Sequence, residues 1–159
     1  MKHLKDIAFA VLLTFAAVLA APWAGAHDTA IKAGNLVITG PWSRQSPMAA
    51  DVAAGFLTIA NTGQEDDRLV KAETAISSMT QIHGMKMEGD VMKMFELPEG
   101  IPIPAGGTVE LKPKSLHLMF MGLAKPPAEG EHFTAMLTFE KAGTVEVQFD
   151  VLAPGAHMN

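Results

Sequence analysis

The 159-residue sequence contains no cysteine and no tyrosine. Without thiols it can form no disulfide framework, no cysteine-ligated zinc or iron–sulfur site and no blue-copper thiolate centre, and it has no cysteine nucleophile. Charged residues are also few, at 18%, against 48% hydrophobic residues, which is the composition of a folded globular chain. The length allows a single domain with a substantial core.

Positive charge is in short supply, because 12 Lys and Arg residues face 17 Asp and Glu residues, for a net charge of −5. This balance gives no support for nucleic acid or an anionic membrane surface as a partner. The sequence also lacks the G-x-S-x-G and His-Glu-x-x-His motifs, and its histidines neighbour methionines in place of carboxylates. We therefore do not expect an enzyme.

The N-terminus has the features of a secretory signal. Lys2 and Lys5 precede an apolar run over residues 7–21, and the small residues Ala24 and Ala26 follow. This order predicts an exported protein whose signal peptide, residues 1–26, is cleaved before His27. An uncleaved membrane anchor is the alternative, but the apolar run is shorter than the ~20 residues that a spanning helix needs. After cleavage we expect no membrane insertion.

The rest of the chain is typical of an all-β domain. Short apolar runs with strand-like alternation are separated by turn sequences rich in Gly, Pro, Asn and Asp, which favours a sandwich or barrel. We expect one β-sandwich domain over residues 27–152 and a short flexible tail over 153–159. Residues 43–51 lack the alternation and are predicted to form a loop, and the charged residues 65–68 a solvated turn. The predicted strands include residues 36–38, 56–59, 116–121, 133–139 and 145–151.

Methionine and histidine cluster in two windows. Residues 83–94 and 116–121 together contain six of the 11 methionines. Methionine most often fills gaps in a hydrophobic core. Strand alternation argues against that role in the second window, because Leu118 and Phe120 would point into the core while His117 and its neighbours would point away from it. The second face, formed by His117, Met119 and Met121, is therefore predicted to lie toward solvent or a shallow depression.

The first window has the pattern of a hairpin. His83, Met85 and Met87 share one strand face, as do Met92 and Met94 on the far side of the turn sequence at residues 89–90. Such a hairpin would bring His83 close to Met94. The sequence thus predicts a group of imidazole and thioether side chains contributed by two separate β segments.

The chemistry of these ligands favours monovalent copper. Thioethers are soft and uncharged, whereas calcium and magnesium prefer oxygen, and zinc prefers thiolate, imidazole or carboxylate. Two histidines and two methionines without an anionic ligand suit Cu(I) better than Cu(II), which favours more nitrogen and oxygen. Methionine sulfur also carries no proton for the metal to displace.

The order of these residues resembles a known family. His83, ten residues, Met94, twenty-two residues and then His117-Leu118-Met119 resemble the His-Met signature of the PCu(A)C periplasmic copper chaperones. Residues 40–44 and 53–63 are similar to that family's early Pro-Trp segment and its next strand. The sequence departs from the family pattern by one extra residue between Met94 and His117, and by Lys114-Ser115 in place of a Gly-rich turn.

The resemblance implies a cupredoxin-like Greek-key β-sandwich that binds Cu(I) through His83, Met94, His117 and Met119. It also implies a periplasmic location and delivery of copper to the dinuclear copper centre of a respiratory cytochrome oxidase. The partner would then be the copper-accepting oxidase subunit or another copper chaperone.

The sequence leaves further ligands and other functions open. Met85 is the best auxiliary ligand because it shares a strand face with His83, and His27 and His157 are candidates for a weaker second site that would take Cu(II). A copper-storage or tolerance protein would bind many metal ions where a carrier binds one. A non-metal interaction module would use the methionine-rich surface to dock a partner.

Overall fold

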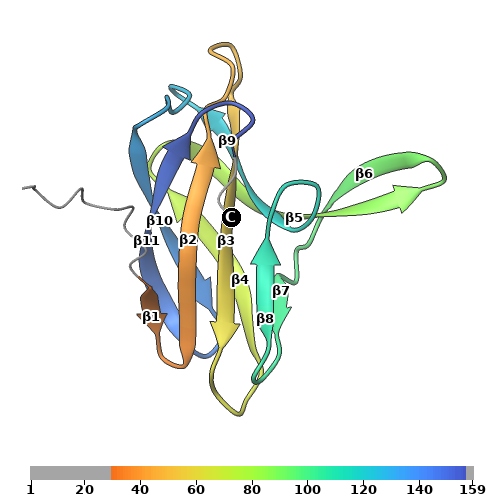
Figure 1. The fold of residues 1–159 in the computed structure, drawn as a ribbon, viewed down its shortest axis with the longest axis vertical. Helices are drawn as coiled ribbons and strands as arrows, with labels where there is room; N and C mark the ends of the chain where they lie inside the picture. Colours follow the sequence, from red (N-terminus) through yellow and green to blue (C-terminus); the bar gives the residue numbers. More distant parts are fainter. Residues whose placement is uncertain (1–29, 157–159) are drawn as a thin grey trace, which may run out of the picture.

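The computed structural model describes residues 30–156, and these form an all-β protein (Figure 1). The predicted signal peptide, residues 1–26, and the last three residues of the predicted tail lie outside the described residues. Within the described part of the chain, no helix has the length and apolar character needed to cross a membrane. The strands, in chain order, are β1 (Ile31–Ala33), β2 (Leu36–Arg44), β3 (Val52–Asn61), β4 (Asp67–Thr74), β5 (Ser77–Glu88), β6 (Val91–Glu96), β7 (Ile101–Ile103), β8 (Thr108–Leu111), β9 (His117–Leu123), β10 (His132–Phe139) and β11 (Gly143–Leu152).

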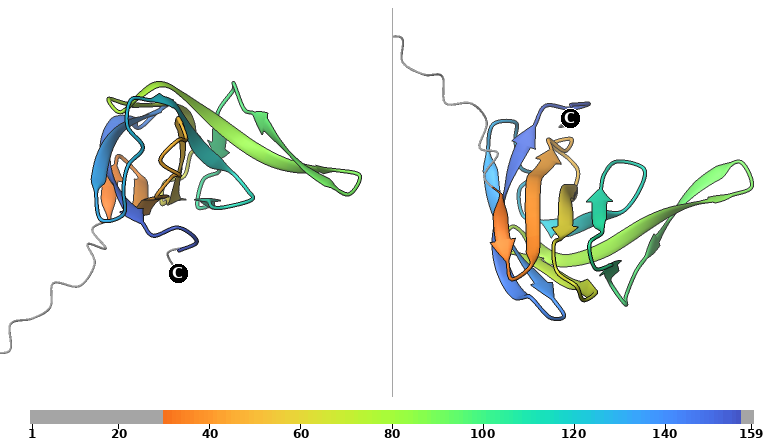
Figure 2. Two further views of the ribbon diagram at one scale, coloured as in Figure 1. Left: turned by 90° about the horizontal axis from the view of Figure 1, so that it is seen from above. Right: turned by 60° about the horizontal axis from the view of Figure 1, so that its bottom comes forward.

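All of these strands join one hydrogen-bonded sheet in the order β6-β5-β9-β3-β2-β11-β10-β4-β7, with β1 on β2 and β8 on β3. The neighbours pair antiparallel except β11 and β2, which run parallel. Seen from above, the sheet curves round on itself (Figure 2). Strands β4 and β5 are not adjacent in the sheet order, but they follow one another in the chain and contact each other. The sheet therefore folds back on itself as a sandwich.

The core consists of the inward-facing residues of these strands. Phe120, Phe133 and Phe149 form its aromatic centre, with ring centroids 5.2 to 5.9 Å apart. Leu118 and Phe120 are fully buried, as the alternation in residues 116–121 predicts. Truncation of one such phenylalanine to alanine costs about 3–5 kcal/mol in a typical core.

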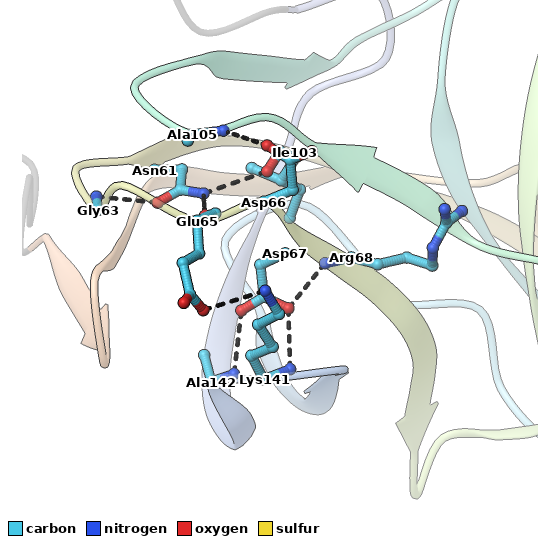
Figure 3. Close-up of polar contacts among 10 residues, drawn as sticks. All are labelled: Asn61, Gly63, Glu65, Asp66, Asp67, Arg68, Ile103, Ala105, Lys141 and Ala142. Carbon is cyan, nitrogen blue, oxygen red and sulfur yellow. Dashed lines mark hydrogen bonds and ion pairs between the residues drawn. The ribbon is translucent and has the colours of Figure 1, made fainter.

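One predicted surface turn is anchored by a buried carboxylate. Asp67, only 9% exposed, accepts hydrogen bonds from the backbone N–H groups of Arg68, Lys141 and Ala142 at 2.7, 2.9 and 2.9 Å (Figure 3). The prediction of a solvated turn at residues 65–68 is therefore wrong for Asp67. Charge alone suggested solvent, but the loop at 140–142 lies close enough to supply donors that replace water.

The loop prediction for residues 43–51 is correct only in part. Strand β2 continues to Arg44, and the Ser43 hydroxyl donates to the carbonyl oxygen of Ala54 at 2.7 Å. The side chain of Arg44 lies with its guanidinium carbon 5.3 Å from the Trp42 ring, and its Nε donates to the Ala156 carbonyl at 2.8 Å. These contacts hold the first part of the segment in the sheet.

Strands β5 and β6 form a long hairpin that projects from the sandwich (Figures 1 and 2). Its two-residue connection begins with Gly89 at a φ of 62°, the backbone conformation that a type II′ turn requires at its first central position. Near the base of the hairpin the Phe95 ring lies over Gly84, where an added Cβ would come within 2.8 Å of the ring. The ring thus covers one face of the hairpin and leaves the opposite face to other side chains.

Candidate metal centre

Strand β5 lies between β6 and β9, and this order gathers the predicted ligands. In the pairing of β5 with β9, His83 stands opposite His117 and Gln81 opposite Met119. In the pairing of β5 with β6, Met85 stands opposite Met94. Directly opposed residues share a sheet face, so all of these side chains lie on the face turned away from Leu118 and Phe120.

The imidazole of His83 contacts side chains on both of its nitrogens. Its Nδ1 lies 2.9 Å from the Sδ of Met94, and its Nε2 lies 2.9 Å from the Oε1 of Gln81. The amide oxygen and the thioether sulfur both only accept hydrogen bonds, and a neutral imidazole has a single N–H. The amide oxygen is the stronger acceptor, which places the proton on Nε2 and leaves Nδ1 without one. The lone pair of Nδ1 therefore faces the methionine sulfur, so that one soft ion could take both as ligands.

The tautomer of His117 is set by the backbone. Its Nδ1 lies 3.0 Å from the carbonyl oxygen of Ser115, which can only accept, so Nδ1 carries the proton and Nε2 keeps a free lone pair that can bind a metal. The two imidazole rings lie edge to face with their centroids 5.6 Å apart. Each ring thus has one nitrogen engaged in a hydrogen bond and one available as a ligand.

The turn before His117 supports this hydrogen bond. Ser115 N–H donates to the Lys112 carbonyl at 3.1 Å, and Lys114 has a φ of 63°, a left-handed conformation that glycine adopts more easily. Lys114 thus has the backbone conformation of the expected Gly-rich turn although its residue type differs. The turn sets the Ser115 carbonyl against the imidazole.

Aromatic side chains border His117 on the side away from the hairpin. Phe56 has its ring centroid 6.5 Å from the His117 ring and 4.5 Å from the Trp42 ring, and both aromatic residues are buried. They exclude water from that side of the imidazole and limit its rotation. On the hairpin side, the imidazole of His83 lies against His117.

The protonation of His83 is shifted by its surroundings. Burial lowers the pKa of this imidazole below its ordinary value of 6.5, and the neighbouring His117 lowers it further, while Glu96, directly opposite on β6, raises it. The net direction is downward, so His83 stays neutral at a lower pH than a free histidine. A neutral imidazole is the form that binds a metal.

Comparison with known proteins assigns the chain to a family. A family model described as "Putative lipoprotein LpqE-like" matches residues 36–151. The chain belongs to the LpqE-like family. It is similar to "Putative lipoprotein Lxx21020" of Leifsonia xyli subsp. xyli, with 28% identity over 128 residues that cover 80% of this chain and 76% of that protein.

Solved structures similar to this LpqE-like chain are PCuAC domains. The copper-bound PCuAC domain from PmoF2 has a TM-score of 0.67 and 24% identity, covering 79% of this chain and 98% of that one. The solution structure of CuI-DR1885 from Deinococcus radiodurans has a TM-score of 0.58 and 26% identity, covering 80% and 83%. The cupredoxin-like fold and the resemblance to PCu(A)C proteins are thereby confirmed.

Methionine accessibility in the LpqE-like chain differs from residue to residue. The side chain of Met94 is 46% exposed, whereas Met119 and Met85 are half-buried. Met119 lies two residues beyond His117 on the same strand face, opposite Gln81. The auxiliary candidates His27 and His157 lie outside the described residues.

The histidines on this face are not directed to open solvent. Alternation predicts that His117 faces solvent or a shallow depression; it is only 5% exposed, and His83 only 9%. Strand β9 does direct the His117 side chain to the face opposite Leu118. On that face, Phe56 and the neighbouring strand β5 shield His117 from solvent. The histidines therefore lie at the bottom of the group, and Met94 lies at its accessible edge.

Sequence reasoning also missed the groups that orient the ligands. Gln81 lies two residues before His83, so strand alternation could have placed it on the same face as His83. The register of the hairpin could have placed Glu96 opposite His83. The Ser115 carbonyl leaves no signal in the side-chain sequence. Among residues 30–156, no three His, Asp or Glu side chains gather as a metal-binding group. The sulfur in contact with His83 is that of Met94.

Proposed function

We propose that this protein is an exported Cu(I) chaperone of the periplasm, which holds the ion through His83, Met94, His117 and Met119. One observation carries the proposal: the unprotonated Nδ1 of His83 faces the sulfur of Met94 at 2.9 Å, beside an imidazole whose Nε2 is also free. The similarity to the structure named CuI-DR1885, at 26% identity, supports Cu(I) as the bound ion. Copper is then the cargo that the protein carries and not a resident cofactor.

The set of donor atoms matches the charge and softness of Cu(I). Two imidazole nitrogens and two thioether sulfurs are neutral, so the bound ion keeps its single positive charge and no proton has to leave a sulfur. The hydrogen bonds that His83 donates to Gln81 and that His117 donates to Ser115 fix both rings before the metal arrives. A pre-oriented site loses less entropy on binding than a flexible one.

The uneven burial of the ligands suits transfer to another protein. Met94 is exposed while both histidines are buried, so an incoming ligand can reach the ion from the methionine side. We propose delivery to the dinuclear copper centre of a respiratory cytochrome oxidase. A cysteine of the acceptor would lose its proton as its sulfur bonds to copper, the bond from copper to Met94 would break, and copper would stay monovalent.

The word lipoprotein in the names of the family and of the Leifsonia protein supports export of this chain, in agreement with its predicted signal peptide. The 159 residues themselves contain no cysteine that could carry a sulfur-linked lipid. We therefore propose a periplasmic carrier released after signal cleavage. Fractionation of cells that express the full chain, with N-terminal sequencing of the periplasmic product, tests this directly, and a product that starts before residue 27 and stays with the membrane would contradict it.

A competition titration against a Cu(I) chelator under anaerobic conditions tests the site. The variant Met94→Leu removes the sulfur but keeps the side-chain volume. The variant His117→Asn keeps a hydrogen-bond donor near the position of Nδ1 but removes Nε2, the nitrogen that would bind copper. Each is expected to lower the Cu(I) affinity at least tenfold, within the range found when metal-site residues are changed. The control Met136→Leu changes an exposed methionine on β10 and should leave the affinity unchanged. Unaltered affinity in both site variants would overturn the assignment.

Carrier and storage functions are separated by stoichiometry and by transfer. A carrier loaded with Cu(I) should pass the ion to the cysteine-containing copper domain of an apo-oxidase subunit. The transfer is measured, after oxidation, by the appearance of that domain's copper absorption. A storage protein would bind many equivalents and release none to this acceptor. Failure of transfer with intact Cu(I) binding would refute delivery to this acceptor but not metal binding.

A further inference from the structure

A row of methionines continues outward from the candidate metal centre along the β5–β6 hairpin. Met85 stands opposite Met94, and Met87 stands opposite Met92 at the next position on the same face. Three of these four side chains are between 44% and 57% exposed, and Met85 is half-buried. Thioethers so exposed fill no gap in a core.

The hairpin geometry brings the sulfurs of each pair within reach of one another. Counting from the two-residue turn, the pairs Met87–Met92 and Met85–Met94 occupy the non-hydrogen-bonded positions, where Cα atoms are about 4.5 Å apart and side chains approach more closely. Successive pairs on one face are about 7 Å apart along the strands, a distance that long side chains can span diagonally. The four thioethers therefore form one continuous group.

The two faces of the hairpin have different chemistry. On the opposite face, Glu88 forms ion pairs with Lys86 and with Lys93, and Lys86 lies over the Phe95 ring. No ion pair among the described residues involves the methionine face of this hairpin, whose strand positions carry only thioethers between His83 and the turn. The hairpin thus keeps its charges and its sulfurs apart.

A second methionine pair on the same strand offers a comparison. Met79 stands opposite Met121 at the other end of the β5–β9 pairing, on the same face as His83. The next pair along the two strands is Gln81 with Met119, and Met119 is already a proposed ligand of the candidate centre. Met79 and Met121 therefore offer two thioethers for a separate site. The hairpin, by contrast, offers three thioethers in addition to Met94.

We propose that Met85, Met87 and Met92 form a second Cu(I) site on the hairpin, next to the site proposed above. Thioether sulfur selects soft monovalent copper, and a site built from it alone carries no charge and titrates with no proton. The inference rests on the proposed function only in taking Cu(I) as the cargo. The second site itself uses no ligand of the first.

The arrangement also connects the two sites. An ion on the hairpin can exchange Met92 for Met94, because the bond to one sulfur breaks as the bond to the other forms, without change of oxidation state and without proton transfer. The hairpin site would then load or unload the buried histidines through the exposed end of the molecule. Weak neutral ligands suit such a position because the ion must leave it again.

The test is an anaerobic titration of the full mature chain with Cu(I), followed by NMR of 13C-labelled methionine methyl groups. In the wild type, the first equivalent should shift the methyls of Met94 and Met119, and a second, weaker equivalent should shift those of Met85, Met87 and Met92. The double variant Met87→Leu with Met92→Leu should lose the second equivalent and retain the first. The matched double variant Met79→Leu with Met121→Leu should retain both.

Two outcomes would overturn the proposal: unmoved methyls at Met87 and Met92 in the wild type, or a second equivalent that persists in the hairpin variant. A Cu(I) titration of His117→Asn distinguishes failure of the hairpin-site proposal from failure of the proposed function. That variant should lose the first equivalent while the hairpin methyls still shift. If the hairpin binds but Met94 and Met119 never respond in the wild type, the hairpin site stands and the four-ligand site is wrong.

Discussion

The Nδ1 atom of His83 lies 2.9 Å from the Sδ atom of Met94, although eleven positions separate the two residues along the chain. The hairpin turn at Gly89 brings them to neighbouring strands, and the hydrogen bond from His83 to Gln81 turns the unprotonated nitrogen toward the sulfur. Two donor atoms are thus oriented toward one another by contacts that involve no metal. Such pre-orientation reduces the entropy that the side chains lose when they bind an ion.

Gln81 is predicted to act as a positioning residue for His83. In Gln81→Leu, the Nε2–H loses its acceptor, so the imidazole can take the other tautomer or rotate, and the Cu(I) affinity should fall about 10-fold or more. The chelator competition assay measures the affinity, and 15N NMR of the imidazole nitrogens reports the tautomer. Gln148→Leu, an exposed position on β11, is the control. A drop in affinity without a tautomer or rotamer change would contradict the positioning role.

The imidazole of His83 is predicted to titrate below 6.5 in the metal-free protein. Burial and His117 both lower its pKa, whereas Glu96 raises it, so Glu96→Gln should lower the pKa of His83 further and His117→Asn should bring it closer to the ordinary value. NMR titration of the His83 Cε1 proton measures these shifts. A His83 pKa above 6.5, or an upward shift in Glu96→Gln, would contradict the prediction.

The same shift has a consequence for folding stability. As the pH falls below about 6.5, the unfolded chain takes up a proton on this histidine before the folded protein does, so the free energy of unfolding should decrease with acidification. The decrease should continue until the pH passes the lowered pKa of the folded state. Urea unfolding of wild type and His83→Gln at several pH values isolates the contribution of this group.

The fold could be predicted further than the site. Alternation identified the core face of residues 116–121, and the turn sequence at 89–90 identified the hairpin that joins His83 to Met94, because both signals are local. The burial of His117 could not be foreseen, since it depends on Phe56 from β3, whose distance to His117 is set by the sheet order. The same holds for Asp67, whose donors at residues 141 and 142 come from the far end of the chain.

Removal of the two ligand side chains should affect the fold unequally. His117 is 5% exposed and donates to the Ser115 carbonyl, so His117→Ala should lower the free energy of unfolding of the metal-free protein by about 1–3 kcal/mol. Met94 is 46% exposed, and Met94→Ala should change the free energy of unfolding by no more than about 0.5 kcal/mol. Urea unfolding in the presence of a copper chelator measures the free energy of unfolding of both variants. Equal losses of stability would contradict the explanation that the burial of His117 makes its removal more costly.

Lys114→Gly is predicted to stabilise the turn that precedes His117. Lys114 adopts a φ of 63°, which costs a residue with a Cβ about 1–2 kcal/mol, and glycine avoids this cost while losing about 0.5–1 kcal/mol through the greater freedom of its unfolded chain. The net gain in unfolding free energy should therefore be about 0.5–1 kcal/mol. Gly89→Ala provides the converse test, because there a side chain would enter the left-handed region at the hairpin turn and should destabilise. Because Lys114→Gly preserves the conformation that holds the Ser115 carbonyl against His117, its Cu(I) affinity should equal that of the wild type, and a weaker affinity would mean that Lys114 contributes to the site through more than its backbone.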